Sequence, residues 1–436
     1  MKKLLSVVLA LLMLAVMLPV TAMADETLPA APTMNGNEWT VTPDNAQATL
    51  DGAYGSIDGK TIILSAGTYG QLELGRATKY PGSNTKTYLR TSAALTERTI
   101  DQIKDEIAAH PGGGYGTPYY VRTMNNVTIK AADGATVTIG KMSAAAGQIY
   151  GTAAAPKRDY VLDIDVPDTN KSYVVSLEWN NINLVGLNFT SSVNIESSDT
   201  ETSVNGLHFE SCSFNSGYPT TTSARDEGMG IRFVSWTTTT DNLKNLTVNN
   251  CKFANCFDGV YTNPVYGVSV TNSTFNSINH NAIAIQDEDV AVDHGNVVIT
   301  GNTFTNVSDR IIRFNNVGEG TTITISKNTS TNSGDDSGEI IKATTRPDTV
   351  KVSMVGNNWG TNKEGIEAKF GNGFTNVVNE PINEQPSTIV IITPTEDTPK
   401  TDDQKNPTTG ANDMVAAAAA LMAVSALGMA VLSRKK

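Results

Sequence analysis

The strongest constraint on the fold is a repeat of apolar positions in the middle of the chain. Its reference position, numbered zero, is occupied in seven successive repeats by Phe189, Phe214, Phe253, Phe275, Phe304, Ser330 and Trp359. The residues seven and five positions earlier are apolar in every repeat, from Ile182 and Leu184 to Val352 and Met354. Repeats of 20–50 residues are typical of solenoids, and alternate residues of a strand share one face. The register therefore predicts coils whose strands stack their inward side chains on the next coil.

Polar residues with a preference for turns separate the strands of each coil. Position −3 is occupied by Ser211, Asn250, Asn272, Gly301 and Gly356. Asn and Gly tolerate the left-handed conformation that a sharp bend requires. A second apolar pair follows position zero, as in Ile231/Phe233, Ile283/Ile285 and Ile312/Phe314. Each coil is thus expected to contribute at least two strands.

The three cysteines do not form a disulfide scaffold, because three cannot all pair within one chain. Cys212 and Cys251 both occupy position −2, and Ser273 follows them in the next coil. Adjacent strands lie about 4.8 Å apart, within disulfide range for Cα atoms. Free cysteine prefers burial, so we expect a reduced, inward stack.

Composition and repeat together favour an all-β protein. Charged residues are 17% of the chain and aromatic residues 6%, a mixture that suits short strands and polar turns. The repeat resembles the right-handed parallel β-helix (solenoid) of the pectin-lyase-like superfamily over roughly residues 35–375. Segments 59–69, 127–130 and 135–139 resemble its first coils.

An insertion of about residues 79–122 interrupts the early coils. Thr99 and Gln102 have the spacing of a helix capping box, and Ile100, Ile103 and Ile107 follow at helical intervals. The insertion therefore predicts a short helix that covers an edge or rims a groove.

Both ends of the chain carry targeting features. Residues 1–24 contain Lys2 and Lys3, an apolar stretch and a small-x-small site at Ala22–Ala24, the pattern of a signal peptide. We expect the β-helix domain to span residues 25–382. Residues 383–405 are rich in Pro, Thr and Asp and predict an extended linker.

Residues 406–436 resemble the cell-wall sorting signals of Gram-positive bacteria. They comprise Asn-Pro-Thr-Thr-Gly at 406–410, an apolar stretch at 414–432 that predicts a hydrophobic helix, and a basic tail. The resemblance implies that a sortase cuts between Thr409 and Gly410 and links Thr409 to peptidoglycan. Asn406 stands where Leu is usual, so a plain membrane anchor is the alternative. Either way, the protein is expected at the cell surface.

The formal net charge of −12 repels nucleic acid and anionic lipid. Neutral glycans, basic partners and Ca²⁺ are compatible with it. We expect a monomer that does not bind nucleic acid.

The register also places polar residues in one column, five positions after zero. The column consists of Asp258, His280, Asp309, Asp335 and Glu364. Arg310 follows Asp309, and Arg232 and Arg313 occupy outward positions of the second strand. A long loop at 217–226 brings in Asp226 and its neighbour Glu227. The sequence therefore predicts a groove in a polysaccharide-active or polysaccharide-binding protein.

Two chemistries fit this groove. Neighbouring carboxylates have separated pKa values and suit acid–base glycoside hydrolysis, whereas a Ca²⁺-assisted lyase would use Arg to remove a proton. The candidate catalytic residues are Asp258, His280, Asp309, Arg310, Arg313 and Asp335. The candidate substrate-binding residues are Asp226, Glu227, Arg232, Tyr261 and Glu364. The alternative is that Asp and Asn simply favour turns.

No catalytic signature of the superfamily transfers cleanly. Asp293-His294-Gly295 resembles part of a pectate lyase motif, and Gly334-Asp335-Asp336 comes after it, opposite to the polygalacturonase order. The acidic residues Asp287, Asp289 and Asp293 predict a Ca²⁺ site, with a solvated loop as the alternative.

Three functional hypotheses follow. The first is a surface protein that binds polysaccharide or host glycan and matrix, as an adhesin does, since solenoids offer long binding surfaces. The second is a tethered polysaccharide lyase or glycoside hydrolase, and the third a structural surface protein without a specific ligand.

Overall fold

The computed structural model describes residues 28–76, 80–91, 94–110, 114, 116–146, 149–150, 173–218, 225–237, 239–287, 290–333, 341–343, 350–360 and 379–380. The chain divides into two compact units, Met1–Ile382 and Asn383–Lys436. The predicted signal peptide, linker and sorting motif, with Thr409 and Gly410, lie outside the described residues. Across the described ranges, no helix is long and apolar enough to cross a membrane.

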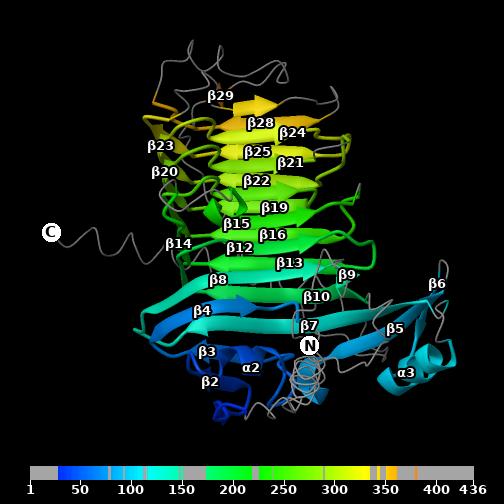
Figure 1. The fold of residues 1–436 in the computed structure, drawn as a ribbon. Helices are drawn as coiled ribbons and strands as arrows, with labels where there is room; N and C mark the ends of the chain where they lie inside the picture. Colours follow the sequence, from blue (N-terminus) through cyan, green and yellow to red (C-terminus); the bar gives the residue numbers. More distant parts are fainter. Residues whose placement is uncertain are drawn as a thin grey trace, which may run out of the picture. The chain divides into compact units, whose positions relative to one another are not determined.

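The first unit is a parallel β-helix-like repeat, in which strands from successive coils form sheets that curl around one axis (Figure 1). The path of the first sheet is β1 (Thr33–Asn35), β2 (Glu38–Val41), β3 (Thr61–Leu64), β7 (Thr117–Ala131), β10 (Tyr173–Val185), β13 (Ser203–Glu210), β16 (Leu243–Asn249), β19 (Tyr266–Thr271), β22 (Asn296–Thr300), β25 (Thr322–Ser326), β28 (Lys351–Val355) and β29 (Asn379–Glu380). Every pairing along this path is parallel except that of β1 with β2.

The second sheet has two arms that share the long strand β8 (Val137–Ala146). One arm continues through β11 (Asn188–Phe189), β14 (Ser213–Asn215), β17 (Lys252–Ala254), β20 (Thr274–Ile278), β23 (Thr303–Val307) and β26 (Thr329–Thr331). The other continues through β12 (Val193–Ser197), β15 (Ile231–Ser235), β18 (Val260–Asn263), β21 (Ile283–Gln286), β24 (Ile312–Asn315) and β27 (Ile341–Ala343). Strand β4 (Gly67–Glu73) also pairs with β8. From β10 to β27, each coil therefore passes through the first sheet and then through both arms of the second.

The predicted register is confirmed by the strand pairing. Leu207 pairs with Ile182 on one side and Leu246 on the other, so position −7 stacks on position −7. The five phenylalanines at position zero form a ladder of stacked rings, with centroids 5.0, 4.6, 4.6 and 5.1 Å apart from Phe189 to Phe304. All five rings are buried, so this ladder forms the centre of the core.

The turn predicted at position −3 is also confirmed. Ser211, Asn250 and Asn272 have φ between 52° and 56°, and Gly301 and Gly356 have φ of 70° and 65°. The thiols of Cys212 and Cys251 at position −2 are free and buried, as expected. Each thiol lies against a carbonyl of the preceding coil, Leu184 for Cys212 and Phe209 for Cys251.

In the later coils, asparagines at position −2 make the bond to a carbonyl of the preceding coil that the cysteine thiols make in the earlier ones. The Nδ2 groups of Asn302, Asn328 and Asn357 donate to the carbonyls of Val270, Ile299 and Ile325. Their Oδ1 atoms accept from the backbone N–H of Ser273, Asn302 and Asn328. This asparagine ladder satisfies buried backbone groups where the chain bends.

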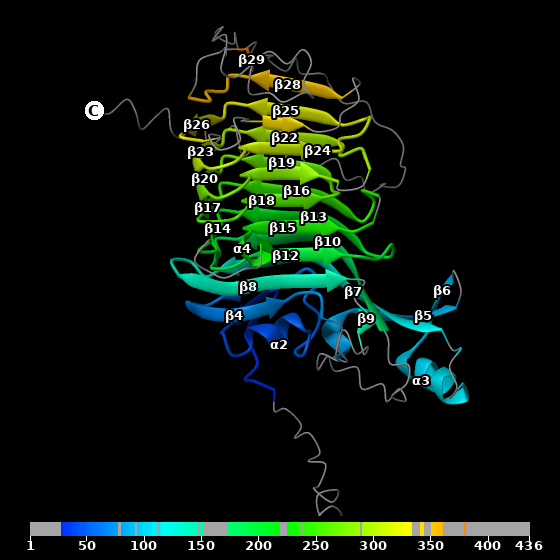
Figure 2. The ribbon, with the colours of Figure 1, turned by 45° about the horizontal axis from the view of Figure 1, so that its top comes forward.

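The insertion projects from the coil stack (Figures 1 and 2). It contains the 3₁₀ turn Pro81–Ser83, the antiparallel strands β5 (Thr85–Thr91) and β6 (Ala94–Glu97), and helix α3 (Ile100–Ala109). The capping box between Thr99 and Gln102 is present, and Ile103 and Ile107 are buried. The short strand β9 (Ile149–Tyr150) pairs with β10 nearby.

Near the first coils, helix α2 (Ala46–Leu50) lies beside a buried charged cluster. Arg122 donates from Nη2 to the Leu50 carbonyl at 2.6 Å. Asp51, at the end of α2, lies 3.4 Å from Arg76. Burial raises the pKa of Asp51 to about 6, although Arg76 and Gln47 oppose the shift. This carboxyl is therefore costly to ionise in the folded protein.

Candidate functional site

A hollow of about 430 Å³, here called the trough, lies on the outer face of the arm that contains β15, β18, β21 and β24. Arg232, Tyr261, Ala284 and Arg313 occupy one register row across these four strands. They point outward because the inward residues beside them, such as Ile231 and Phe314, belong to the core. All but Ala284 line the trough.

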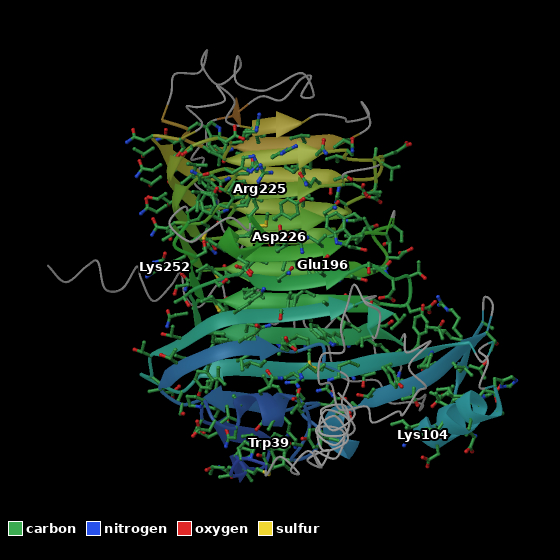
Figure 3. All side chains as sticks on the ribbon, viewed as in Figure 1. Trp39, Lys104, Glu196, Arg225, Asp226 and Lys252 are labelled. Atoms are coloured by element: carbon green, nitrogen blue, oxygen red, sulfur yellow. The ribbon has the colours of Figure 1, made fainter. Side chains whose placement is uncertain are left out.

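The short helix α4 (Arg225–Gly228) stands at one side of the trough. The Arg225 guanidinium lies 5.4 Å from the centre of the Phe257 ring. Gly228 fits closely against the Tyr218 ring, since a Cβ there would come within 2.7 Å of it. Figure 3 shows Arg225, Asp226 and Glu196 together on the coil stack, with Lys252 at its side.

Arg232 is the most buried cation of the trough, with 4% of the residue exposed. Its Nη1 donates to Glu196 Oε2 at 2.7 Å and to Asn194 Oδ1 at 2.9 Å, and its Nε lies 3.6 Å from Asp226. Trp236 donates to the other oxygen of Glu196 at 2.6 Å. Burial alone would raise the pKa of Glu196, but Arg232 and Trp236 outweigh it and lower the pKa.

His280 lies between two carboxylates at the edge of the trough. Its Nδ1 is 3.0 Å from Asp258 Oδ1, and its Nε2 is 3.3 Å from Asp309 Oδ2. Asp309 also pairs with Arg310. The imidazole stacks on the Phe257 ring with centroids 4.8 Å apart. Because both ring nitrogens are engaged, His280 is held in one orientation.

Asp258 is almost fully buried, with 1% of the residue exposed. Its Oδ1 accepts hydrogen bonds from the backbone N–H and the Nδ2 of Asn281, at 2.7 and 3.0 Å. The next residue, Gly259, passes against the Phe275 ring, and a Cβ there would come within 2.6 Å of it. The absence of a side chain at Gly259 thus lets the backbone approach the core where Asp258 turns outward.

Two polar atoms in the trough are buried and have no hydrogen-bond partner among the described residues, Arg313 Nε and Gln286 Oε1. Gln286 donates from Nε2 to the Tyr261 hydroxyl at 2.6 Å. Neither Arg225 nor Arg313 pairs with a carboxylate in the part of the chain that the structure describes. The trough therefore offers one free acceptor, Gln286 Oε1, and free cationic donors on Arg225 and Arg313. Buried polar atoms normally have a hydrogen-bond partner, so the unpaired Gln286 Oε1 and Arg313 Nε indicate a place for a ligand.

Most of the predicted site residues lie together. Asp226, Arg232, Asp258, Tyr261, His280 and Arg313 line the trough, and Asp309 and Arg310 join it through His280. Glu227 points elsewhere, to Lys141 at 3.7 Å. Asp335 and Glu364 lie outside the described residues.

The predicted Ca²⁺ site has less support. Asp287 Oδ1 accepts from Val290 N–H, and Asp293 Oδ1 accepts from Gly295 N–H, while Asp289 lies outside the described residues. Within the described ranges, no three His, Cys, Asp or Glu side chains are grouped to hold a metal ion.

The sequence interpretation missed several residues that line the trough: Arg225, Met229, Trp236, Phe257, Gln286 and Asn315. Gln286 and Asn315 share a register position, directly after the inward residues Ile285 and Phe314. The repeat could have revealed these two as an outward pair. Arg225 and Trp236 lie outside the regular strands, so no periodic signal marks them.

Comparison with protein-family models, with curated proteins and with solved structures finds no match for this chain. The function is therefore inferred from the trough itself.

Proposed function

We propose that this chain is a surface-displayed protein that binds an acidic polysaccharide in the trough. The observation that carries the proposal is the pair of unsatisfied buried atoms, Gln286 Oε1 and Arg313 Nε. A sugar hydroxyl would donate to Gln286 Oε1, and a sugar carboxylate would accept from Arg313 Nε.

The remaining lining residues support the same ligand class. Trp236 and Tyr261 supply aromatic rings with polar ends at the trough, a combination that suits a ring with one apolar face and a hydroxylated rim. Arg225 and Arg313 bring to the trough two guanidinium groups that no carboxylate of the described residues pairs, although the chain carries a net charge of −12. An arginine fork matches a carboxylate in geometry as well as charge.

Three further features predicted from the sequence form part of what we propose. They are a right-handed β-helix of the pectin-lyase-like type, export through the signal peptide, and attachment by a sortase at Thr409. Together they would present the trough outside the cell, where polysaccharides are found.

Binding of the purified protein to polygalacturonate tests the proposal, with neutral galactan as the uncharged comparison. Arg313→Gln should weaken binding to polygalacturonate by about 10- to 150-fold, since one charge-assisted hydrogen bond is worth about 1.5–3 kcal/mol. Arg98→Gln is the matched control, because Arg98 lies in the insertion, is exposed, and donates to the Glu97 carbonyl of its own strand end. Equal binding by wild type and Arg313→Gln, or no binding at all, would refute the proposal.

A second candidate, a lyase or hydrolase that uses the same trough, is favoured by one observation. Asp258 and Asp309 approach one imidazole from opposite ring nitrogens. Release of unsaturated or reducing ends that is lost in Asp258→Asn and kept in Arg98→Gln would establish this activity. Binding without turnover would exclude it for that polymer.

A further inference from the structure

The direction of the trough follows from the strands that supply its residues. The row Arg232, Tyr261, Ala284 and Arg313 crosses four neighbouring strands, from β15 to β24. Three steps between strands amount to about 14 Å. The long dimension of this row therefore runs along the coil axis.

Along the strands, by contrast, the trough is closed at one side. The trough is bounded by Phe257, Asp258 and His280, which lie where the chain bends before β18 and β21, and α4 lies beside them. His280 is stacked on Phe257 and paired with carboxylates on both sides. This wall stands across the path that a long polymer would follow along one coil.

The groups that would contact a ligand are also distributed along the axis. Trp236 follows β15, Gln286 ends β21 and Arg313 lies in β24. Trp236 is 44% exposed although its indole N–H is held by Glu196, so one ring face is available at the β15 end. The free Arg313 Nε lies at the β24 end.

From this arrangement, and given the proposed polysaccharide function, we infer that the ligand chain lies along the coil axis. It would place about three sugar residues between Trp236 and Arg313, one for each step between coils. Ala284 supports this path: it occupies the middle of the row and is fully buried, so its small side chain keeps the floor low between Tyr261 and Arg313.

The test uses the complete protein and oligogalacturonates of one to six residues, with affinities measured by calorimetry. Affinity should rise steeply up to about three residues and then level off. Trp236→Ala and Arg313→Gln should each weaken the trimer about tenfold, whereas the dimer should be sensitive to only one of them. Tyr266→Ala, which removes an exposed ring on β19 of the other sheet, is the matched aromatic control.

Two further variants separate contact from folding effects. Trp236→Phe keeps an aromatic ring but removes the indole N–H that bonds Glu196, so it should retain most of the trimer affinity. Ala284→Leu should raise the floor and weaken the trimer more than the dimer.

The outcomes distinguish the two proposals. If polygalacturonate binds but no oligomer loses affinity in both Trp236→Ala and Arg313→Gln, the ligand does not lie along the coil axis. In that case only this inference fails. If affinity is already maximal for the monomer, the inference fails in the same way. If neither polymer nor oligomers bind, the proposed function itself fails.

Discussion

His280 Nδ1 and Asp258 Oδ1 lie 3.0 Å apart although the two residues are separated by 22 positions in the chain. The contact exists because successive coils place the same register position side by side. It joins two residues of the trough wall that come from successive coils, and His280 also stacks on the third, Phe257.

Replacing His280 should therefore loosen the wall without unfolding the coil. Asp258 keeps its two bonds from Asn281, so His280→Ala should reduce the free energy of unfolding by only about 1–2 kcal/mol. Affinity for polygalacturonate should fall about tenfold, as measured by calorimetry. His208→Ala, on the outer face of β13, is the matched control, and an equal loss of affinity in that variant would contradict the role of His280.

The buried Asp51 should make stability depend on pH. Its pKa is about 6 in the folded protein, against the ordinary value of 3.8 that we take for the unfolded chain. Between these values the unfolded chain binds fewer protons, so stability falls as pH rises through this window, by up to about 3 kcal/mol. Asp51→Asn should be more stable than wild type near neutral pH in urea denaturation. The difference should shrink toward about pH 4, and an unchanged difference would show that another group is responsible.

The asparagine ladder should contribute strongly to stability. Asn328 donates to the Ile299 carbonyl and accepts from the N–H of Asn302, all within the core. Asn328→Ala leaves these backbone groups buried and unsatisfied, which should cost about 2–4 kcal/mol. Asn276→Ala, on the exposed face of β20, should change stability by less than about 0.5 kcal/mol. Thermal or urea denaturation of both variants measures the contrast, and similar losses would refute it.

Two buried serines should respond in opposite directions. Ser273 Oγ accepts from the Cys251 N–H at 3.0 Å and donates to the Thr271 carbonyl at 2.8 Å, so Ser273→Ala should destabilise by about 1–2 kcal/mol. Ser330 takes the position-zero place of a ring, and its Oγ has no partner among the described residues. Ser330→Ala should therefore be neutral or stabilising by about 1 kcal/mol. Urea denaturation of the two variants side by side checks the sign of each change.

The sequence predicted the coils well because their inward residues repeat. Position zero and its flanks are set by core packing, and the one ring missing from the phenylalanine ladder, at Ser330, still keeps its strand pairing. The capping box of α3 was also recognisable, since it depends on two residues three apart. These features are local or periodic.

The site was only partly predictable, because part of it lies outside the periodic strands. Asp258 and His280 were found through the column, but Arg225 reaches the trough from a short helix in a long loop, and Trp236 lies just beyond the end of β15. The ladder of Asn302, Asn328 and Asn357 was missed for another reason. Its column begins with two cysteines and a serine, and only the hydrogen-bond geometry shows that the side chains at this position donate to backbone carbonyls beside the bend.

The trough takes its residues from four successive coils, and this has a consequence for how the protein acquires its activity. If the trough binds a polysaccharide as proposed, the site would be complete only when all four coils have docked, because Arg232 lies on the first of the four strands and Arg313 on the last. A chain folded only as far as β23 would already contain all five phenylalanines of the ladder and would still lack Arg313 in β24. Under the proposed function, ligand binding would stabilise only molecules in which all four coils have formed.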